Sequence, residues 1–232
     1  DGLLVGVAAH FWNGFLAVPA PRQLETVVEK ALGASSRTVA GLTGPHEQVV
    51  AARRFLGAQD WPAAVEAPEG LFGLDLSELR VPDRLASGAA RCRRPRDEEL
   101  AFLSVWRAAY RREALGEPEG GENAKAAGDD VRALHLAGSH FVLDVEGEGA
   151  PVAYSAFNAS LPEIVQVGGV WTPPEERGRG CARAVVAGSL LEARAQGVVR
   201  AVLFTENPAA RRAYEALGFR RLGEYGLVIF RT

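Results

Sequence analysis

The segment from residue 164 to residue 196 constrains the fold more than any other part of the chain. It begins with an apolar, β-branched run, Ile164 to Trp171, that is typical of a buried strand. It ends with Ala182 to Gln196, where apolar residues recur every three or four positions and predict a helix with one buried face. A turn with two glycines joins them. This order of strand, glycine turn and helix predicts an α/β fold.

The turn between this strand and this helix has the features of an anion-binding loop. Gly178 and Gly180 have no Cβ, so the backbone can bend sharply there and present bare N–H groups. Those groups open the helix, where the first four donors lack an internal partner and the helix dipole is positive. Arg177 and Arg179 add full positive charges beside them. We therefore expect the loop to hold a pyrophosphate.

The spacing of the loop residues narrows the choice of ligand. The loop matches neither a P-loop nor the dinucleotide fingerprint with three glycines. It reads Arg177-x-x-Gly180-x-Ala182, which resembles the acetyl-CoA loop of the GNAT N-acetyltransferase superfamily. Residues 203–219 resemble the strand, asparagine, helix, tyrosine and Gly-Phe block that follows this loop in the same superfamily. The alternative is an ordinary strand–helix unit with a coincidental Arg-Gly-Arg-Gly turn.

The resemblance covers residues 88–232 and implies the GNAT acyl-CoA N-acyltransferase fold there, an α/β fold with a mixed sheet. Residues 1–78 show strand and helix patterns of their own, and residues 38–56 repeat the strand, turn and helix order without the basic loop. We interpret 1–78 as a smaller α/β domain, either a degenerate half-copy of the same fold or an unrelated extension. Residues 79–87, around Pro82, are the predicted linker.

Local patterns give five further expectations. Gly, Glu and Ala dominate residues 116–130, which predicts a mobile loop followed by a short helix at 130–136. The other four are a hairpin of strands 3–9 and 15–18 around Asn13-Gly14, a turn at 43–45, a helix whose N-cap is Asp97, and a tail of two strands at 220–222 and 226–230.

The resemblance also implies roles for individual residues. Tyr214 matches the tyrosine that protonates the leaving thiolate, and Asn207 matches the residue that hydrogen-bonds the pantetheine arm. Glu163, just before the central strand, is the candidate general base, with a simple turn carboxylate as the structural alternative. The strand end and the loop would bind the cofactor through Val170, Trp171, Thr172, Arg177, Gly178, Arg179, Gly180, Cys181 and Ala182.

The composition excludes several classes of function. With 47% hydrophobic and 24% charged residues and a net charge of −3, the chain does not suit general binding to nucleic acids or anionic membranes. We find no apolar run of bilayer length and no signal peptide. Cys92 and Cys181 lack metal-ligand spacing, so we predict no metal, free thiols and a cytoplasmic location. The chain starts at Asp1 and has no methionine, which is consistent with residues being absent from it.

These observations predict an enzyme that transfers an acyl group, most simply acetyl, from acetyl-CoA to a primary amine in a ternary complex. The acceptor would be a small molecule or a peptide. Whether the protein forms a homodimer is left open by the sequence. A non-catalytic protein that binds acyl-CoA through the same fold is the alternative. An interaction module built on residues 1–78 is a third class.

Overall fold

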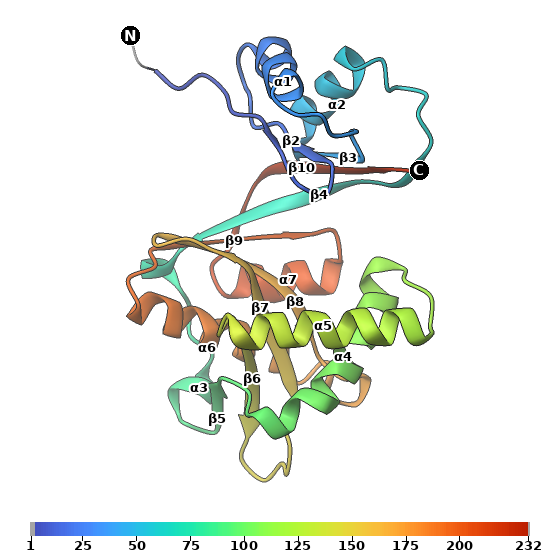
Figure 1. Cartoon of the computed structure of the whole chain (residues 1–232). Coiled ribbons are helices and arrows are strands. Elements are labelled where there is room, and N and C mark those ends of the chain that lie inside the picture. The colour runs from blue at the N-terminus through green and yellow to red at the C-terminus, as the bar shows by residue number, and fades with distance from the viewer. Residues whose placement is uncertain (1–2, 232) are drawn as a thin grey trace. The chain divides into compact units, whose positions relative to one another are not determined.

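The computed structural model describes residues 3–231, apart from the side chain of Ala67. These residues form seven α-helices and ten strands in a mixed sheet, which confirms the predicted α/β class (Figure 1). They divide into two compact units. The smaller unit holds the residues up to 71, residues 204–206 and those from 221 onward, and the larger unit holds 72–203 and 207–220. None of the described helices is long and apolar enough to cross a membrane.

The smaller unit is a sheet with two helices and its own core. Strand β3 pairs in parallel with β2 and antiparallel with β10, and the strand order is β1-β2-β3-β10-β4. The core contains Leu16, Leu42, Val49 and Phe230. The elements of this unit are β1 (Ala9–His10), β2 (Phe15–Ala17), α1 (Leu24–Gly33), β3 (Gly41–Pro45), α2 (His46–Phe55), the start of β4 (Ala63–Asp75) and the end of β10 (Arg220–Phe230).

One local prediction for this unit was confirmed in part, and two were wrong. The hairpin around Asn13-Gly14 forms, but its first strand is only Ala9–His10. Residues 43–45 are not a turn, because they belong to β3, which has strand partners on both edges. The tail is one continuous strand, β10, with Gly226 inside it. A Cβ at Gly226 would lie 3.1 Å from the Cβ of Val49, so this glycine allows close approach of α2 rather than a turn.

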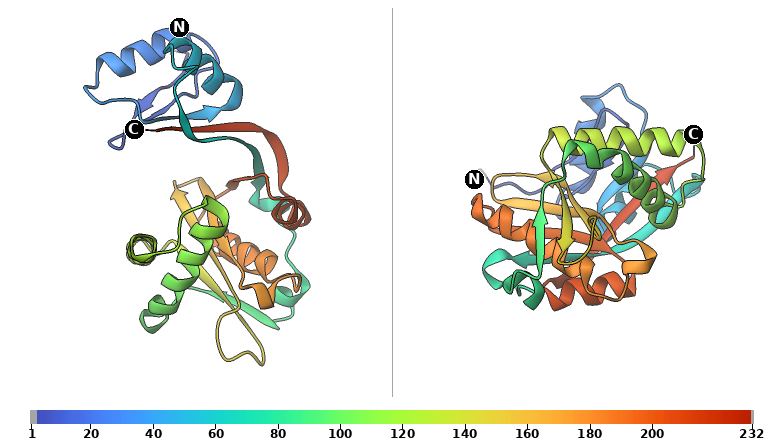
Figure 2. Two further views of the ribbon diagram at one scale, coloured as in Figure 1. Left: turned by 90° about the vertical axis from the view of Figure 1, so that its right-hand side faces the viewer. Right: turned by 90° about the horizontal axis from the view of Figure 1, so that it is seen from below.

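The larger unit has the strand order β4-β9-β8-β7-β6-β5. Helices α4 and α5 cover one face of its sheet, and α6 and α7 cover the other (Figure 2). Neighbouring residues of β6 alternate between the faces, with Phe141 and Leu143 toward α6 and Val142 toward α4. Its remaining elements are α3 (Asp83–Ala86), β5 (Ala90–Arg93), α4 (Leu100–Leu115), α5 (Gly121–Leu136), β6 (His140–Val145), β7 (Ala153–Ser160), β8 (Ile164–Trp171), α6 (Cys181–Ala195), β9 (Arg200–Thr205) and α7 (Pro208–Ala216).

The two units do not follow the limits predicted from the sequence. Strand β10 carries Val228 and Phe230 into the core of the smaller unit, although it ends the chain. Helix α3 lies within the predicted linker, residues 79–87. That residues 1–78 are a degenerate half of the same fold stays a prediction.

Helix α5 replaces most of the mobile loop predicted at residues 116–130, so that prediction was wrong. Its buried residues, Asn123, Ala127 and Val131, recur every four positions and face α4. Alanine is the best helix former, and its small side chain lets two helices approach closely. The Asn123 amide donates to the carbonyl oxygen of Ala108 at 3.2 Å, and its oxygen accepts from Arg111 at 2.9 Å. The absence of large apolar residues therefore marked a tight helix contact, not disorder.

The start of the preceding helix also differs from the prediction. Asp97 is not the N-cap, because the capping interaction comes from Glu99, whose carboxylate accepts from the Arg96 backbone N–H at 2.7 Å. Glu99 is nearly buried and is held by Arg93 at 2.7 Å. The Asp97 carboxylate instead lies 2.9 Å from His135 Nε2.

A chain of hydrogen-bonded side chains runs from Asp97 into the core. His135 Nδ1 lies 3.0 Å from His140 Nε2, and His140 Nδ1 lies 3.1 Å from the Tyr154 hydroxyl. A carboxylate only accepts hydrogen bonds, so with both imidazole rings neutral His135 Nε2 donates to Asp97. His140 Nε2 then donates to His135 Nδ1, and the Tyr154 hydroxyl donates to His140 Nδ1. His140 is 1% exposed. Burial, then His135 and Arg94, lower the pKa of His140 to about 4.

The buried His140 predicts a loss of stability in mild acid. Because its pKa is lower in the folded than in the unfolded state, its contribution is present above pH 6.5 and is lost as the pH falls to about 4. The free energy of unfolding should decrease by up to about 1.4 kcal/mol per pH unit in this window. Urea denaturation between pH 7 and 4.5 measures it. His140→Asn should flatten the dependence, and an unchanged slope in a folded His140→Asn protein would contradict the prediction.

Candidate active site

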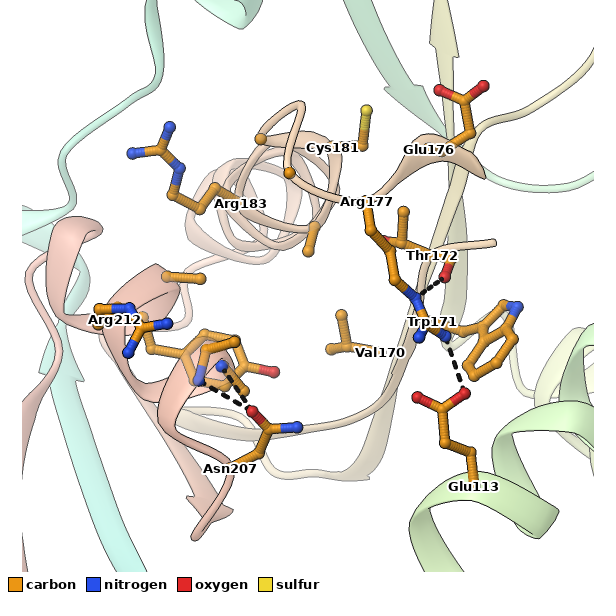
Figure 3. A pocket seen from close by; sticks show the side chains of 17 residues that line it. Glu113, Val170, Trp171, Thr172, Glu176, Arg177, Cys181, Arg183, Asn207 and Arg212 are labelled. Carbon is orange, nitrogen blue, oxygen red and sulfur yellow. Dashed lines mark hydrogen bonds and ion pairs between the residues drawn. The ribbon is translucent and has the colours of Figure 1, made fainter. Parts of the chain in front are cut away.

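A cavity of about 500 Å³ lies in the larger unit. It is formed by the end of β8, the loop that follows, the first turn of α6 and one side of α7, with Glu113 of α4 at its rim (Figure 3). Of the predicted site residues, it brings together Val170, Trp171, Thr172, Arg177, Gly178, Gly180, Cys181, Ala182, Asn207 and Tyr214. Its volume is that of a pocket for a small organic ligand.

Strand β8 reaches the cavity because it separates from β9. The register pairs only Ile164 to Gln166 with Arg200 to Val202. From Val167 onward, no described strand pairs in that register with the edge of β8 toward β9. Backbone groups on such an edge can pair with an extended ligand as with an added strand.

A β-bulge bends the same part of β8. Tyr154 pairs with Trp171 and Ala156 with Gly168, so two steps along β7 match three along β8. Gly169 has φ 60°, which favours glycine. A Cβ there would lie 2.6 Å from the Arg107 guanidinium, and one at Gly168 would overlap the Asn158 amide. Bulges of this kind re-aim the end of a strand, here toward the cavity.

The loop leaves a run of backbone donors unused. Gly178 and Gly180 have φ 76° and 78°, and the first helical hydrogen bond of α6 is from the Ala184 N–H to the Gly180 oxygen. Within residues 3–231, the backbone N–H groups of residues 178–182 make no backbone hydrogen bond. They lie at the positive end of a 15-residue helix. This arrangement can hold an anion such as a pyrophosphate.

The two loop arginines, which we expected to add full positive charges beside the N–H groups, both pair with carboxylates of this chain. The Arg177 N–H donates to Pro174, and its guanidinium donates to the Thr172 oxygen at 3.0 Å and to Glu113 at 2.8 Å (Figure 3). The same group stacks 4.9 Å from the centre of the Trp171 ring. Arg179 pairs with Glu148 at 3.1 Å and does not line this cavity. Both arginines therefore hold the loop in shape through carboxylates of this chain.

Two residues of the cavity lining each have a buried polar side-chain atom without a hydrogen-bond partner among the described residues. These atoms are Trp171 Nε1 and Thr172 Oγ1. Burying a hydroxyl or an N–H without a hydrogen bond costs free energy. Thr172 Oγ1 is the one of the two whose missing partner we expect a bound molecule with amide groups to supply.

The opposite wall is formed by the start and middle of α7. The Asn207 oxygen accepts from the backbone N–H groups of Ala209 and Ala210 at 2.9 and 3.2 Å, so Asn207 caps the helix. Tyr214, which is 8% exposed, packs its ring against Phe219. Burial, and then Tyr110, raise the pKa of the Tyr214 phenol above its ordinary value. The phenol is therefore neutral at physiological pH and can act as a proton donor.

Glu163 lies far from this cavity along the same strand. It precedes the first residue of β8, about 23 Å of strand from Val170. Its side chain is 75% exposed and lies 3.8 Å from Arg200. The geometry supports a turn carboxylate here and does not support the predicted role as general base.

Two cationic side chains extend the cavity beyond the predicted set. Arg183 and Arg212 lie on the same side of it, one from α6 and one from α7 (Figure 3). Arg183 belongs to neither of the two sequence motifs. It follows Gly180 by three residues, and helical side chains lean toward the helix N-terminus, so the spacing could have placed it beside the loop.

Comparison with known proteins agrees with this geometry. Among the solved structures that resemble this one is a GCN5-related N-acetyltransferase from Kribbella flavida, with TM-score 0.61 and 16% identity over 99% of this chain and 89% of that chain. A GNAT-family acetyltransferase from Colwellia psychrerythraea gives TM-score 0.58 and 16% identity over 99% and 82%. A glucosamine N-acetyltransferase region of a fungal multi-domain β-N-acetylglucosaminidase gives TM-score 0.58 and 15% identity, over 97% of this chain and 31% of that one.

These likenesses define a protein with the GNAT fold. The model of the acetyltransferase (GNAT) family matches residues 100–219, more than half of the chain. The chain therefore belongs to the GNAT acetyltransferase family, as its sequence motifs indicated. No curated protein matches the sequence.

The loop geometry predicts the effect of a side chain at Gly180. Valine there would be strained at φ 78°, and its Cβ would lie 3.2 Å from the Arg183 guanidinium, beside the unused N–H groups. Gly180→Val should abolish acetyl-CoA binding, measured by calorimetry, while the protein stays folded.

Gly147→Val is the matched control. Gly147 has φ 85° in the β6–β7 turn, and no atom lies within 4 Å of its Cβ position. It therefore carries a similar backbone strain without touching the cavity. Unchanged acetyl-CoA affinity in folded Gly180→Val would contradict the prediction.

Proposed function

We propose that this protein transfers an acetyl group from acetyl-CoA to the primary amine of an acceptor, directly and within a ternary complex. The observation that carries the proposal is the position of the unpaired edge of β8. It leads into the same cavity as the unused N–H groups of residues 178–182 and the Tyr214 side chain. An extended, phosphate-bearing thioester needs these three features together.

The residues that line the cavity fit acetyl-CoA, the proposed acyl donor. The pyrophosphate would accept hydrogen bonds from the N–H groups of 178–182. The pantetheine arm, which carries amides, would pair with β8 near Val170, where Thr172 Oγ1 has no partner within residues 3–231. The thioester supplies an activated acyl group.

The acyl transfer can be described from the groups of this chain. A backbone N–H near Val170 would donate to the carbonyl oxygen, where negative charge develops as the neutral amine attacks the carbonyl carbon. As the C–S bond breaks, Tyr214 would give its hydroxyl proton to the sulfur. Burial raises the pKa of the Tyr214 phenol above its ordinary value, so this proton transfer is uphill by at least the difference between the ordinary pKa values of a phenol and a thiol, roughly 1.5 pKa units.

The proton on the acceptor ammonium has to leave before attack. Glu163 is too far along β8 to take it. Glu113 and Glu176 are the carboxylates that line the cavity, and each pairs with a loop arginine. We therefore assign no protein base and expect water to take the proton.

A binding protein without turnover is the second candidate. The Tyr214 hydroxyl weighs against it, because it makes no hydrogen bond to another of the described residues 3–231 and its ring lines the cavity. Release of free thiol from acetyl-CoA with a panel of small amines and lysine peptides tests the two. Tight acetyl-CoA binding without thiol release for any amine would favour the binding protein.

Tyr214→Phe separates catalysis from packing. The change keeps the ring against Phe219 and removes only the hydroxyl. Single-turnover transfer should slow by roughly 10²–10⁴-fold, as for a lost general acid, with acetyl-CoA affinity nearly unchanged. Tyr225→Phe is the control, since Tyr225 does not line the cavity. An undiminished rate in Tyr214→Phe would show that Tyr214 is not the acid.

A further inference from the structure

A second cavity, of about 410 Å³, opens beside the first in the larger unit. Its walls are residues 80–84, the loop before α6, the first turn of α6 and the last turn of α7. It shares Gly180 and Arg183 with the first cavity, so a ligand held at the loop can reach both.

Positive charge dominates this second cavity. Four arginines line it, Arg80, Arg84, Arg179 and Arg183, against one carboxylate, Asp83. Arg179 is neutralised by Glu148 and Glu176. Among the described residues, no carboxylate forms an ion pair with the other three arginines, although most arginines of the larger unit have such a partner.

Two of these three arginines, Arg84 of α3 and Arg183 of α6, have side chains beside the start of α6. Arg84 Nη1 is 3.4 Å from Cys181 Sγ, and Arg183 Nη2 is 3.2 Å from the position that a Cβ of Gly180 would take. Both cations therefore stand beside the positive end of the helix dipole, where like charges repel. A bound anion with several oxygen acceptors would turn this repulsion into attraction.

We propose that the second cavity binds the 3′-phosphate on the ribose of CoA, and so selects CoA over donors that lack this group. The inference rests on the proposed function. The loop N–H groups would donate to the pyrophosphate of CoA. The third phosphate of CoA therefore needs other donors. A phosphomonoester carries close to two negative charges at neutral pH and accepts paired hydrogen bonds from guanidinium groups. Arg80 and Arg84 lie outside residues 100–219, so the family match does not include them.

The experiment compares CoA with dephospho-CoA, which differs only by the 3′-phosphate. Calorimetric titrations in a buffer free of phosphate and sulfate use the full chain, the double variant Arg80→Gln/Arg84→Gln, and Arg91→Gln as control. Arg91 is exposed, lies in the same unit and does not line the cavity. The wild type should bind CoA about tenfold to a hundredfold more tightly than dephospho-CoA, as charge-assisted hydrogen bonds predict.

The outcomes separate the subsite from the proposed function. The double variant should lose most of the preference for CoA and keep its affinity for dephospho-CoA, and Arg91→Gln should behave as the wild type. Equal wild-type affinity for the two ligands would overturn the subsite and leave the acetyl-CoA function standing. Equal weakening of both ligands in the double variant would also overturn it, since those arginines would then act on the pyrophosphate or the fold. No binding of either ligand would overturn both proposals.

Discussion

The separation of β8 from β9 is the feature on which the candidate site depends. In the part of the chain that the structure describes, only Ile164 to Gln166 of β8 pair with β9, and the rest of that edge has no strand partner in this register. Backbone N–H and C=O groups left without partners in a protein interior are costly. An extended ligand that pairs with this edge removes that cost. The geometry of the sheet thus suits the extended, amide-bearing ligand that we propose, before any side chain contributes.

The bulge that bends β8 is held by side chains from the layer of α4 and α5. Arg107 of α4 fills the space above Gly169, and Asp130 of α5 fixes it through a 2.9 Å ion pair. Arg111 donates to the same carboxylate at 3.1 Å and to Asn123. Helix α5, with its small buried face, therefore supports the bulge at the site as well as the core.

Whether a feature could be predicted from the sequence depends on how far apart along the chain the residues that determine it lie. The central strand, the glycine loop, α6 and the position of Asn207 before α7 depend on local periodicity and capping, which a sequence displays directly. Helix α5 and the single strand β10 depend on contacts with α4 and α2, so alanine and Gly226 were misinterpreted. Glu163 was placed correctly at the start of the strand, but the cavity lies at the other end.

The loop arginines show that a charged side chain near a binding loop is not necessarily available to a ligand. Arg177 and Arg179 belong to the loop motif, but carboxylates of this chain already pair with both. Paired charges attract an anion less than free ones, so we expect the motif to act mainly through its backbone N–H groups and the helix dipole. Arg84 and Arg183 form no such ion pairs among the described residues. In the proposed complex, we therefore expect selectivity for the third phosphate of CoA to come from residues around the motif rather than from the motif itself.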